Sequence, residues 1–302
     1  MVRKGLIAAA AIVALGVGAY FSRGALGDAV DAITAADPNW LWVAGIAFIA
    51  ATVAAAGSWR CAVGLAGGDT GLIDACARYG AGSLVNTLVP FRAGDAVRLA
   101  LFSKLVPHAK RVRATVGSFA ALGAARALVL TALVGAGALA GAVPLWPLAV
   151  LIGLVAIAAG AAYFARRHES DGFLDAFRAL AEDKEAAARL IAWMVASTVA
   201  RYLAAAAVCA SLGIHAAFAA AIIILPALDL AGLFPVTPGN AGLTSGAIAV
   251  ALRAHGVSFD DGLAAGLAFH AVETAVGLLF GIMGAVWFAP AIKLRERLTS
   301  TA

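Results

Sequence analysis

The chain has 302 residues, of which 63% are hydrophobic and only 13% charged, and its mean hydropathy is +0.94. This composition excludes a soluble globular domain, because the surface of such a domain needs more charge to stay dispersed in water. The formal net charge of +5 does not require a nucleic-acid partner, since the basic residues lie in short loops where membrane topology places them.

Apolar stretches long enough to cross a bilayer as a helix recur along the chain. The first covers residues 5–20 and follows Arg3 and Lys4. We interpret it as an uncleaved span rather than a signal peptide, because the rest of the chain is equally apolar. Five more spans are predicted at about 40–59, 114–140, 145–165, 190–212 and 262–288.

Clusters of basic residues set the predicted orientation. Arg3 and Lys4 place the N-terminus in the cytoplasm, and the basic residues of 293–297 place the C-terminus there too. Segments 22–39, 140–146 and 253–262 are then external. Apolar residues at helical spacing among the charges of 173–180 predict a short helix lying in the interface. We therefore predict an all-α, multi-pass protein of a bacterial inner membrane with six spans.

Two apolar segments do not fit as full spans. Segment 72–103 lies between two cytoplasmic points, and its apolar arms, 79–89 and 96–102, are too short to cross. Segment 216–255 lies between two external points, and counting its first arm as a span would put the basic C-terminal tail outside. Two re-entrant hairpins, one from each side of the membrane, reconcile every loop.

The tips of the two predicted hairpins share a sequence pattern. Leu88–Ala96 and Leu233–Ala241 both read Leu-apolar-Pro-x-x-x-Gly-(Asp/Asn)-Ala, at an offset of 145 (235 − 90). Because the flanking spans run in opposite directions, the pattern indicates an inverted-topology repeat with its site, and both tips, near the bilayer midplane. Asp95 and Asn240 are predicted N-caps of the second arms. The residues expected to break the helices are Pro90, Gly94, Pro235, Pro238 and Gly239.

The whole chain, 1–302, is expected to form a single integral membrane domain. Its predicted parts are 1–38 (first span and external loop), 39–143 (first half of the repeat, with hairpin 72–103), 144–189 (fourth span and cytoplasmic amphipathic linker), 190–290 (second half, with hairpin 216–255) and 291–302 (cytoplasmic tail).

Charged side chains within the membrane are costly and mark protein interiors or wet cavities. Arg92, at the first hairpin tip, is predicted to clamp a lipid phosphate, because arginine offers two parallel donors to phosphate oxygens. Arg98 is assigned the same role, with two alternatives: it pairs with Asp95, or it extends to the cytoplasmic surface. Asn86 and Asp229 are expected to satisfy backbone groups freed near the two tips.

Other intramembrane charges lie in the spans. Arg126 has only apolar neighbours and needs a partner, for which Asp229 and Glu273 are available, either in a structural ion pair or around a substrate. His270 and Glu273 share one face of the last span, which suits either proton coupling or an interhelical hydrogen bond. Arg201 is noted as a further intramembrane charge. The predicted substrate-binding residues are Arg78, Asn86, Arg92, Asp95, Arg98, Arg126, Thr237, Asn240, His270 and Glu273.

The two hairpin motifs together resemble a known family. The residues Arg78, Asn86, Pro90–Asp95 and Arg98, with Pro235–Leu243, are similar to the transmembrane domain of the lysylphosphatidylglycerol synthase/flippase family. The resemblance implies a lipid-translocating membrane domain, which in relatives is sometimes fused to a soluble aminoacyl-transfer domain. We expect no such soluble domain in this chain, whose residues are consumed by membrane segments. The chain differs from the family pattern at Thr244-Ser245, where an acidic residue is usual, and at His270, where arginine is.

These features predict a flippase or transporter for a phosphate-bearing lipid, either a phospholipid or a polyprenyl-phosphate-linked sugar. A membrane enzyme that modifies lipid head groups and a non-transporting subunit of a lipid-synthesis complex are the alternatives. The sequence has no metal-ligand spacing and no His-Glu-x-x-His motif, so we expect no enzyme, metal or cofactor. Expected partners are lipids with an anionic phosphate head group, together with a second copy of the chain or a lipid-synthesising enzyme.

Overall fold

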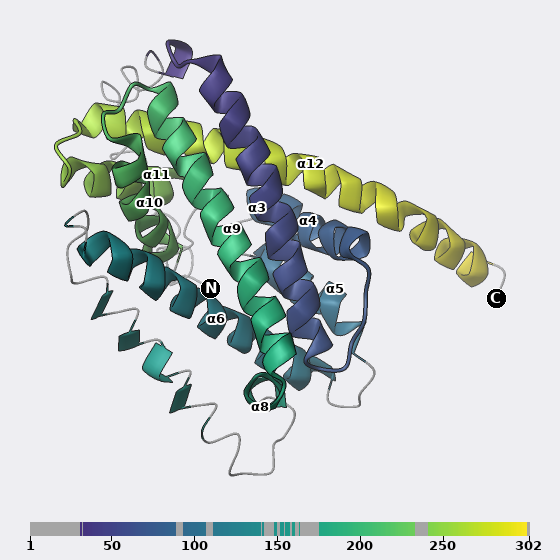
Figure 1. The fold of residues 1–302 in the computed structure, drawn as a ribbon. Coiled ribbons are helices and arrows are strands. Elements are labelled where there is room, and N and C mark those ends of the chain that lie inside the picture. The colour runs from purple at the N-terminus through teal and green to yellow at the C-terminus, as the bar shows by residue number, and fades with distance from the viewer. Residues whose placement is uncertain are drawn as a thin grey trace, which may run out of the picture.

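The computed structural model describes residues 31, 33–88, 93–106, 111–139, 141, scattered positions within 148–163, 175–232 and 241–300. Within these residues the regular elements are all α-helices, which confirms the predicted fold class (Figure 1). They are α3 (Pro38–Gly64), α4 (Leu72–Leu88), α5 (Ala93–Ser103), α6 (Arg111–Leu139), α8 (Asp175–Glu182), α9 (Lys184–Ser211), α10 (Ala217–Ala231), α11 (Ala241–Arg253) and α12 (Phe259–Ser300).

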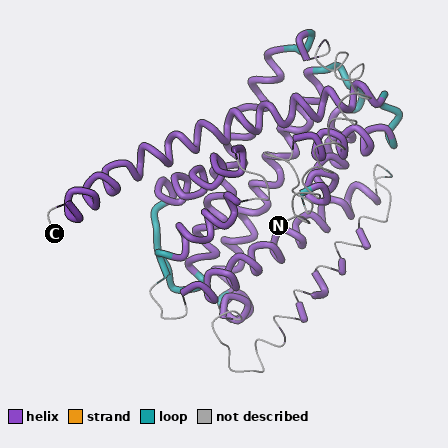
Figure 2. Tube along the Cα trace, turned by 180° about the vertical axis from the view of Figure 1, so that it is seen from behind, coloured by secondary structure: helices purple, strands orange, loops and turns teal. Residues whose placement is uncertain are grey.

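Four helices, α3, α6, α9 and α12, are long and apolar enough to cross a membrane. They occupy four of the six predicted spans. The predicted span 5–20 lies outside the described residues, and that at 145–165 is described only at scattered positions. Helix α12 continues past its apolar stretch, which ends at Phe288, and its last turns extend away from the bundle in both views (Figures 1 and 2).

The two segments predicted as hairpins each form a pair of short helices. Helices α4 and α5 pack on one another, as do α10 and α11. The tips between them, 89–92 and 233–240, lie outside the described residues. The prediction that Pro90 and Pro235 meet near the midplane therefore concerns residues that the structure does not describe. The side on which each pair opens also stays a prediction.

Helices α3 and α9, which correspond under the offset of 145, pack side by side and antiparallel (Figure 1). The backbone N–H of Asp37 donates to the carbonyl of Ser211 (2.9 Å), and Ser197 Oγ donates to the carbonyl of Ala51 (3.1 Å). The Trp193 ring of α9 packs on the face of α3 at Gly57. Contacts thus move backward along α9 as they move forward along α3, so the two corresponding helices run in opposite directions.

The pairs of helices that pack on one another stay the same when the two halves of the repeat are exchanged. With α3, α4, α5 and α6 corresponding to α9, α10, α11 and α12, each contact has a counterpart: α4 packs on α12 as α10 packs on α6, and α5 packs on α6 as α11 packs on α12. Likewise α3 packs on α4, α6 and α12, as α9 packs on α10, α12 and α6. Together with the antiparallel α3 and α9, this is the arrangement that an inverted-topology repeat requires.

The α4–α12 contact is much more extensive than its counterpart between α6 and α10. Gly80, Gly281 and Gly284 form this tight interface, where an added Cβ would overlap the facing helix; at Gly281 it would lie 2.6 Å from Leu84 Cβ. Small residues allow such close approach of helices in lipid. The offset of 145 places Leu225, Ala136 and Leu139 at the corresponding positions of α10 and α6, where Leu225 is buried but Ala136 and Leu139 are exposed. The glycine-mediated contact of the tight interface therefore has no counterpart between α6 and α10.

Candidate functional site

Arg98 fastens the two arms of the first helical pair together. Its Nη1 donates to Asp95 Oδ1 (2.7 Å), its Nη2 to Ser83 Oγ (2.7 Å) and its Nε to the carbonyl of Tyr79 (3.2 Å). The guanidinium also lies over the Tyr79 ring, 4.0 Å from its centre, and the side chain is only 11% exposed. Of the roles considered for Arg98, the structure therefore shows the pairing with Asp95.

Asn86 of α4 contacts the start of α5 in the same pair. Its Oδ1 accepts from the backbone N–H of Gly94 (2.7 Å), and its Nδ2 donates to Asp95 Oδ1 (3.2 Å). Asn86 thus satisfies a free amide at the start of α5, as expected. The prediction that Asp95 is the N-cap of α5 is wrong, because the helix begins at Ala93 and Asp95 lies in its first turn. The acceptor for the exposed amide comes from the opposite arm instead.

Arg78 ties the base of this pair. Its Nε donates to Asp74 Oδ2 (2.6 Å) and its Nη1 to the carbonyl of Leu101 (2.7 Å). Asp74 also accepts from Thr70 Oγ1 (2.6 Å) and from Trp287 Nε1 (3.1 Å), near the end of the apolar stretch of α12. Burial alone would raise the pKa of Asp74, but these hydrogen bonds and the Arg78 charge hold it below its ordinary value. The donors of the Arg78 guanidinium are therefore used by contacts within the α4–α5 pair.

A second group of charged side chains lies within the long helices α6, α9 and α12 and near the end of the short helix α10. Arg126 of α6 donates through Nε (3.1 Å) and Nη2 to the two carboxylate oxygens of Asp229 in α10. Arg126 is 13 residues from each end of the apolar stretch 113–139 (126 − 113 and 139 − 126). This separation corresponds to about 20 Å of helix in each direction. Of the two acids that the sequence offered to Arg126, the structure selects Asp229.

Arg201 of α9 and Glu273 of α12 form the neighbouring pair. Arg201 Nη2 lies 3.4 Å from Glu273 Oε1, at the long end of the range for a hydrogen bond. Arg201 Nε is buried and has no acceptor among the described residues. Glu273 lies 14 residues from Phe259 and 15 from Phe288, in the middle of its span (273 − 259 and 288 − 273). We call Arg126, Arg201, Asp229 and Glu273 the central cluster.

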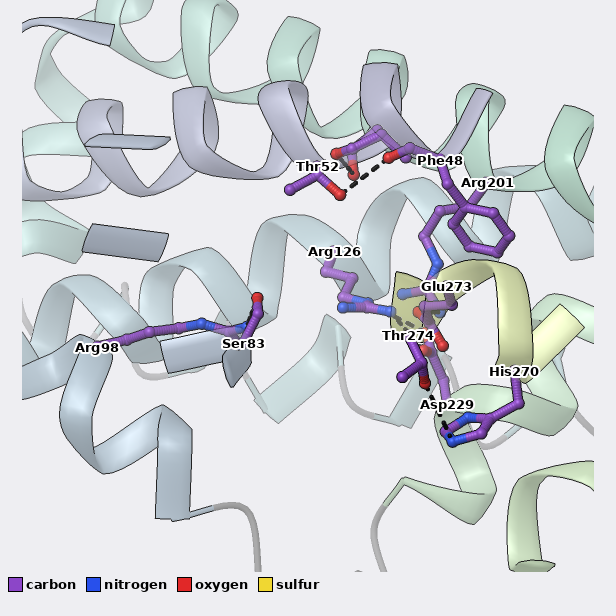
Figure 3. A network of polar contacts seen from close by, with 12 residues as sticks. Phe48, Thr52, Ser83, Arg98, Arg126, Arg201, Asp229, His270, Glu273 and Thr274 are labelled. Atoms are coloured by element: carbon purple, nitrogen blue, oxygen red, sulfur yellow. Dashed lines mark hydrogen bonds and ion pairs between the residues drawn. The ribbon is translucent and has the colours of Figure 1, made fainter. Parts of the chain in front are cut away.

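The members of the central cluster converge from four helices (Figure 3). Arg98 and Ser83 lie apart from them in this view. The exposed fractions of the side chains are 43% for Arg126, 26% for Asp229, 22% for Arg201 and 41% for Glu273. Two positive and two negative charges thus balance where the four helices meet, while remaining partly accessible. Such an arrangement can exchange a carboxylate for the phosphate of a lipid without leaving an arginine unpaired.

His270 contacts Thr274 within its own helix, at 3.3 Å between Nε2 and Oγ1, whereas Glu273 pairs with Arg201 of α9. The expected interhelical bond therefore forms for Glu273, and proton coupling through either residue stays a prediction.

The structure brings together only part of the predicted binding set. Arg126 and Glu273 belong to the central cluster, while Arg78, Asn86, Asp95 and Arg98 hold the α4–α5 pair. Arg92, Thr237, Asn240, Pro235, Pro238 and Gly239 lie outside the described residues. Arg201 and Asp229 were identified from the sequence as intramembrane charges, and Asp229 as a candidate partner of Arg126, but neither was in the predicted binding set. In the described ranges, no group of three or more His, Cys, Asp or Glu residues could hold a metal ion.

Comparison with known families finds a match over nearly the whole chain. The sequence model of the family described as the lysylphosphatidylglycerol synthase TM region matches residues 6–281, nearly the whole chain. The comparisons with curated proteins and with solved structures find no match.

Proposed function

Since the chain belongs to the family of the lysylphosphatidylglycerol synthase TM region, we propose that this multi-pass membrane protein moves a phosphate-bearing lipid across the bacterial inner membrane. The lipid is a phospholipid or a polyprenyl-phosphate-linked sugar. The observation that carries the proposal is the central cluster: two arginines, each beside a carboxylate, partly accessible in the middle of membrane-length helices.

The energetic problem in lipid movement is the head group. A phosphate in hydrocarbon loses its hydration, which is prohibitively costly for an isolated ion. Arginines fixed at mid-depth supply the donors that water supplies outside, and their geometry matches phosphate oxygens. Asp229 and Glu273 neutralise these arginines when no lipid is present. The cluster therefore provides the polar environment that a crossing head group needs.

The packing of the two halves supports movement rather than static binding. The tight interface between α4 and α12 and the loose interface between α6 and α10 are counterparts under the exchange of halves. Exchanging their states would open the α4–α12 side and close the α6–α10 side. In inverted repeats such an exchange moves access from one side of the membrane to the other around a fixed central site. The proposed cycle alternates between these two packings.

The test is transport in liposomes that hold the purified full-length protein and a trace of phosphatidylglycerol carrying a fluorescent head-group label. A membrane-impermeant quencher reports how much label reaches the outer leaflet. We expect the wild-type protein to equilibrate the label faster than protein-free liposomes. We expect Arg126→Gln/Arg201→Gln to lose this activity at matched folded amounts, and Arg189→Gln to keep it. Arg189 is a matched control because it pairs with Glu185 on the exposed start of α9.

Equal rates with and without protein would contradict transport. In that case the two alternatives, a head-group-modifying enzyme and a non-transporting subunit, would be separated by analysis of lipid products and of co-purifying proteins.

A further inference from the structure

We propose that one edge of the Arg201 guanidinium, formed by Nε and Nη2, is the subsite for the lipid phosphate, and that Glu273 is the resident counter-ion that the phosphate displaces. The inference rests on the proposed function and deepens it, because it assigns the head group to one arginine of the central cluster.

The arginines of the membrane helices differ in how fully their donors are used. Arg78 and Arg98 each hold a carboxylate and a backbone carbonyl at 2.6–3.2 Å, and Arg126 holds both oxygens of Asp229. Arg201 makes one contact within the described part of the chain, at 3.4 Å. Among these four arginines, Arg201 therefore has the largest unused capacity to donate.

The geometry of the unused donors fits an oxyanion. Nε and Nη2 lie on the same edge of a guanidinium, and Arg126 uses this edge for its two bonds to Asp229. On Arg201 the same edge is half occupied: Glu273 lies at long range from Nη2, and the buried Nε faces no acceptor in the described residues. A buried donor without an acceptor is unfavourable. Two phosphate oxygens would satisfy both donors of this edge at once.

Glu273 is placed to leave Arg201 without becoming isolated. Its side chain is more exposed than that of Arg201, so it has room to turn away. Glu273 also lies within electrostatic range of Arg126, so a displaced carboxylate stays beside a cation. With a singly charged phosphodiester bound, the central cluster carries one net negative charge. This excess charge limits how tightly the lipid is held, as a carrier that must release its cargo requires.

The test measures, by calorimetric titration, how tightly dioctanoylphosphatidylglycerol binds to the purified full-length protein in detergent. Dioctanoylglycerol, which lacks the phosphate, is the comparison ligand. We expect Arg201→Gln to weaken phosphatidylglycerol binding by about 10- to 100-fold, as the loss of a charge-assisted pair implies. We expect Glu273→Gln to tighten it, because the competing carboxylate is gone. Glu273→Gln should have no such effect when Arg201→Gln is also present, and Arg189→Gln should bind as the wild type does.

Two results would overturn the assignment: unchanged binding by folded Arg201→Gln, or weaker binding by folded Glu273→Gln. If either variant fails to fold by thermal melting, Arg201→Lys and Glu273→Asp replace them. The lysine keeps the charge and loses the planar edge, and the aspartate is too short to hold its place beside Arg201, so the same directions are expected.

The binding test and the transport test fail separately. If the Arg201 and Glu273 variants change binding as expected but the wild type moves no lipid in liposomes, the phosphate subsite stands and the transport proposal falls. If the wild type moves lipid but Arg201→Gln binds and transports normally, transport stands and the subsite falls.

Discussion

Arg126 in α6 and Asp229 in α10 are 103 residues apart in the sequence and form a two-bond ion pair across the loose interface between these helices. The corresponding α4–α12 interface combines glycine-mediated backbone contact with the hydrogen bond from Trp287 to Asp74. The two corresponding interfaces are thus stabilised differently, one by an ion pair in the middle of α6 and the other by close packing with a hydrogen bond near the end of the apolar stretch of α12.

Removing one member of the Arg126–Asp229 pair should destabilise the protein more than removing both. Asp229→Asn leaves the arginine charge uncompensated, and we expect a loss of about 1–3 kcal/mol, below the value for fully buried pairs because Arg126 is partly exposed. Adding Arg126→Gln should recover most of this loss. Unfolding of the single and double variants measures the coupling, and strictly additive effects would show that the two side chains do not interact.

Adding a single methyl group at Gly281 should destabilise the protein at the tight interface. Gly281→Ala would place a Cβ 2.6 Å from Leu84 Cβ, and we expect a loss of stability of about 1–3 kcal/mol. Gly277→Ala on the same helix is the matched control, since its Cβ would lie 3.8 Å from Ser83 Cβ, an ordinary contact. Thermal melting compares the two variants. Equal stabilities would mean that α4 and α12 are not packed this closely.

Asp74 should make the stability depend on pH in a defined direction. The folded-state pKa of Asp74 lies below its ordinary value of 3.8, so its hydrogen bonds stabilise the fold fully above that value. This stability is lost as the pH falls through the lower, folded-state pKa. Asp74→Asn should therefore melt at a lower temperature than the wild type at neutral pH, with a difference that shrinks in strong acid. A difference in melting temperature that stays constant with pH would show that the charge of the Asp74 carboxylate does not cause it.

The two pairs of short helices were predictable from the sequence, whereas the pairing of the charges was not. Matched proline and glycine residues near 90 and 235 located both pairs, because these residues act locally on the backbone. The prediction that Gly94 breaks the helix is wrong, since Gly94 lies in the first turn of α5. The sequence also required a partner for Arg126 but offered two acids. Choosing between them depends on which helices are adjacent, and no local pattern encodes that.

For Arg98, one contact could be predicted from the sequence and the others could not. Its assignment to a lipid phosphate followed from its place near the hairpin tip, but Asp95 stands three residues before it on the same helix and takes one of its donors. This local pairing was available as an alternative in the sequence. The contacts with Ser83 and Tyr79 of the other arm, which commit the remaining donors, depend on the close approach of two helices at Gly82 and Gly94.

The orientation of the chain in the membrane can be tested by labelling. In a variant without Cys61, Cys76 and Cys209, we expect Ala35→Cys to react with an impermeant maleimide in intact cells and Arg295→Cys to react only after lysis. An externally reactive cysteine at 295 would reverse the predicted topology.

Cross-linking α4 to α12 tests whether lipid crosses by exchange between the tight and loose packings of the two interfaces. An added Cβ at position 277 would lie 3.8 Å from Ser83 Cβ, which matches the mean Cβ–Cβ separation of about 3.8 Å in disulfides. In a variant without the native cysteines, Ser83→Cys/Gly277→Cys should therefore join α4 to α12 on oxidation. The measurement is the rate at which head-group-labelled phosphatidylglycerol crosses liposomes holding this variant, before and after reduction, with the two single-cysteine variants as controls. If lipid crosses by this exchange, the oxidised protein moves no lipid and reduction restores transport, while transport by the two single-cysteine variants does not change on reduction. Equal transport by cross-linked and reduced protein would contradict it.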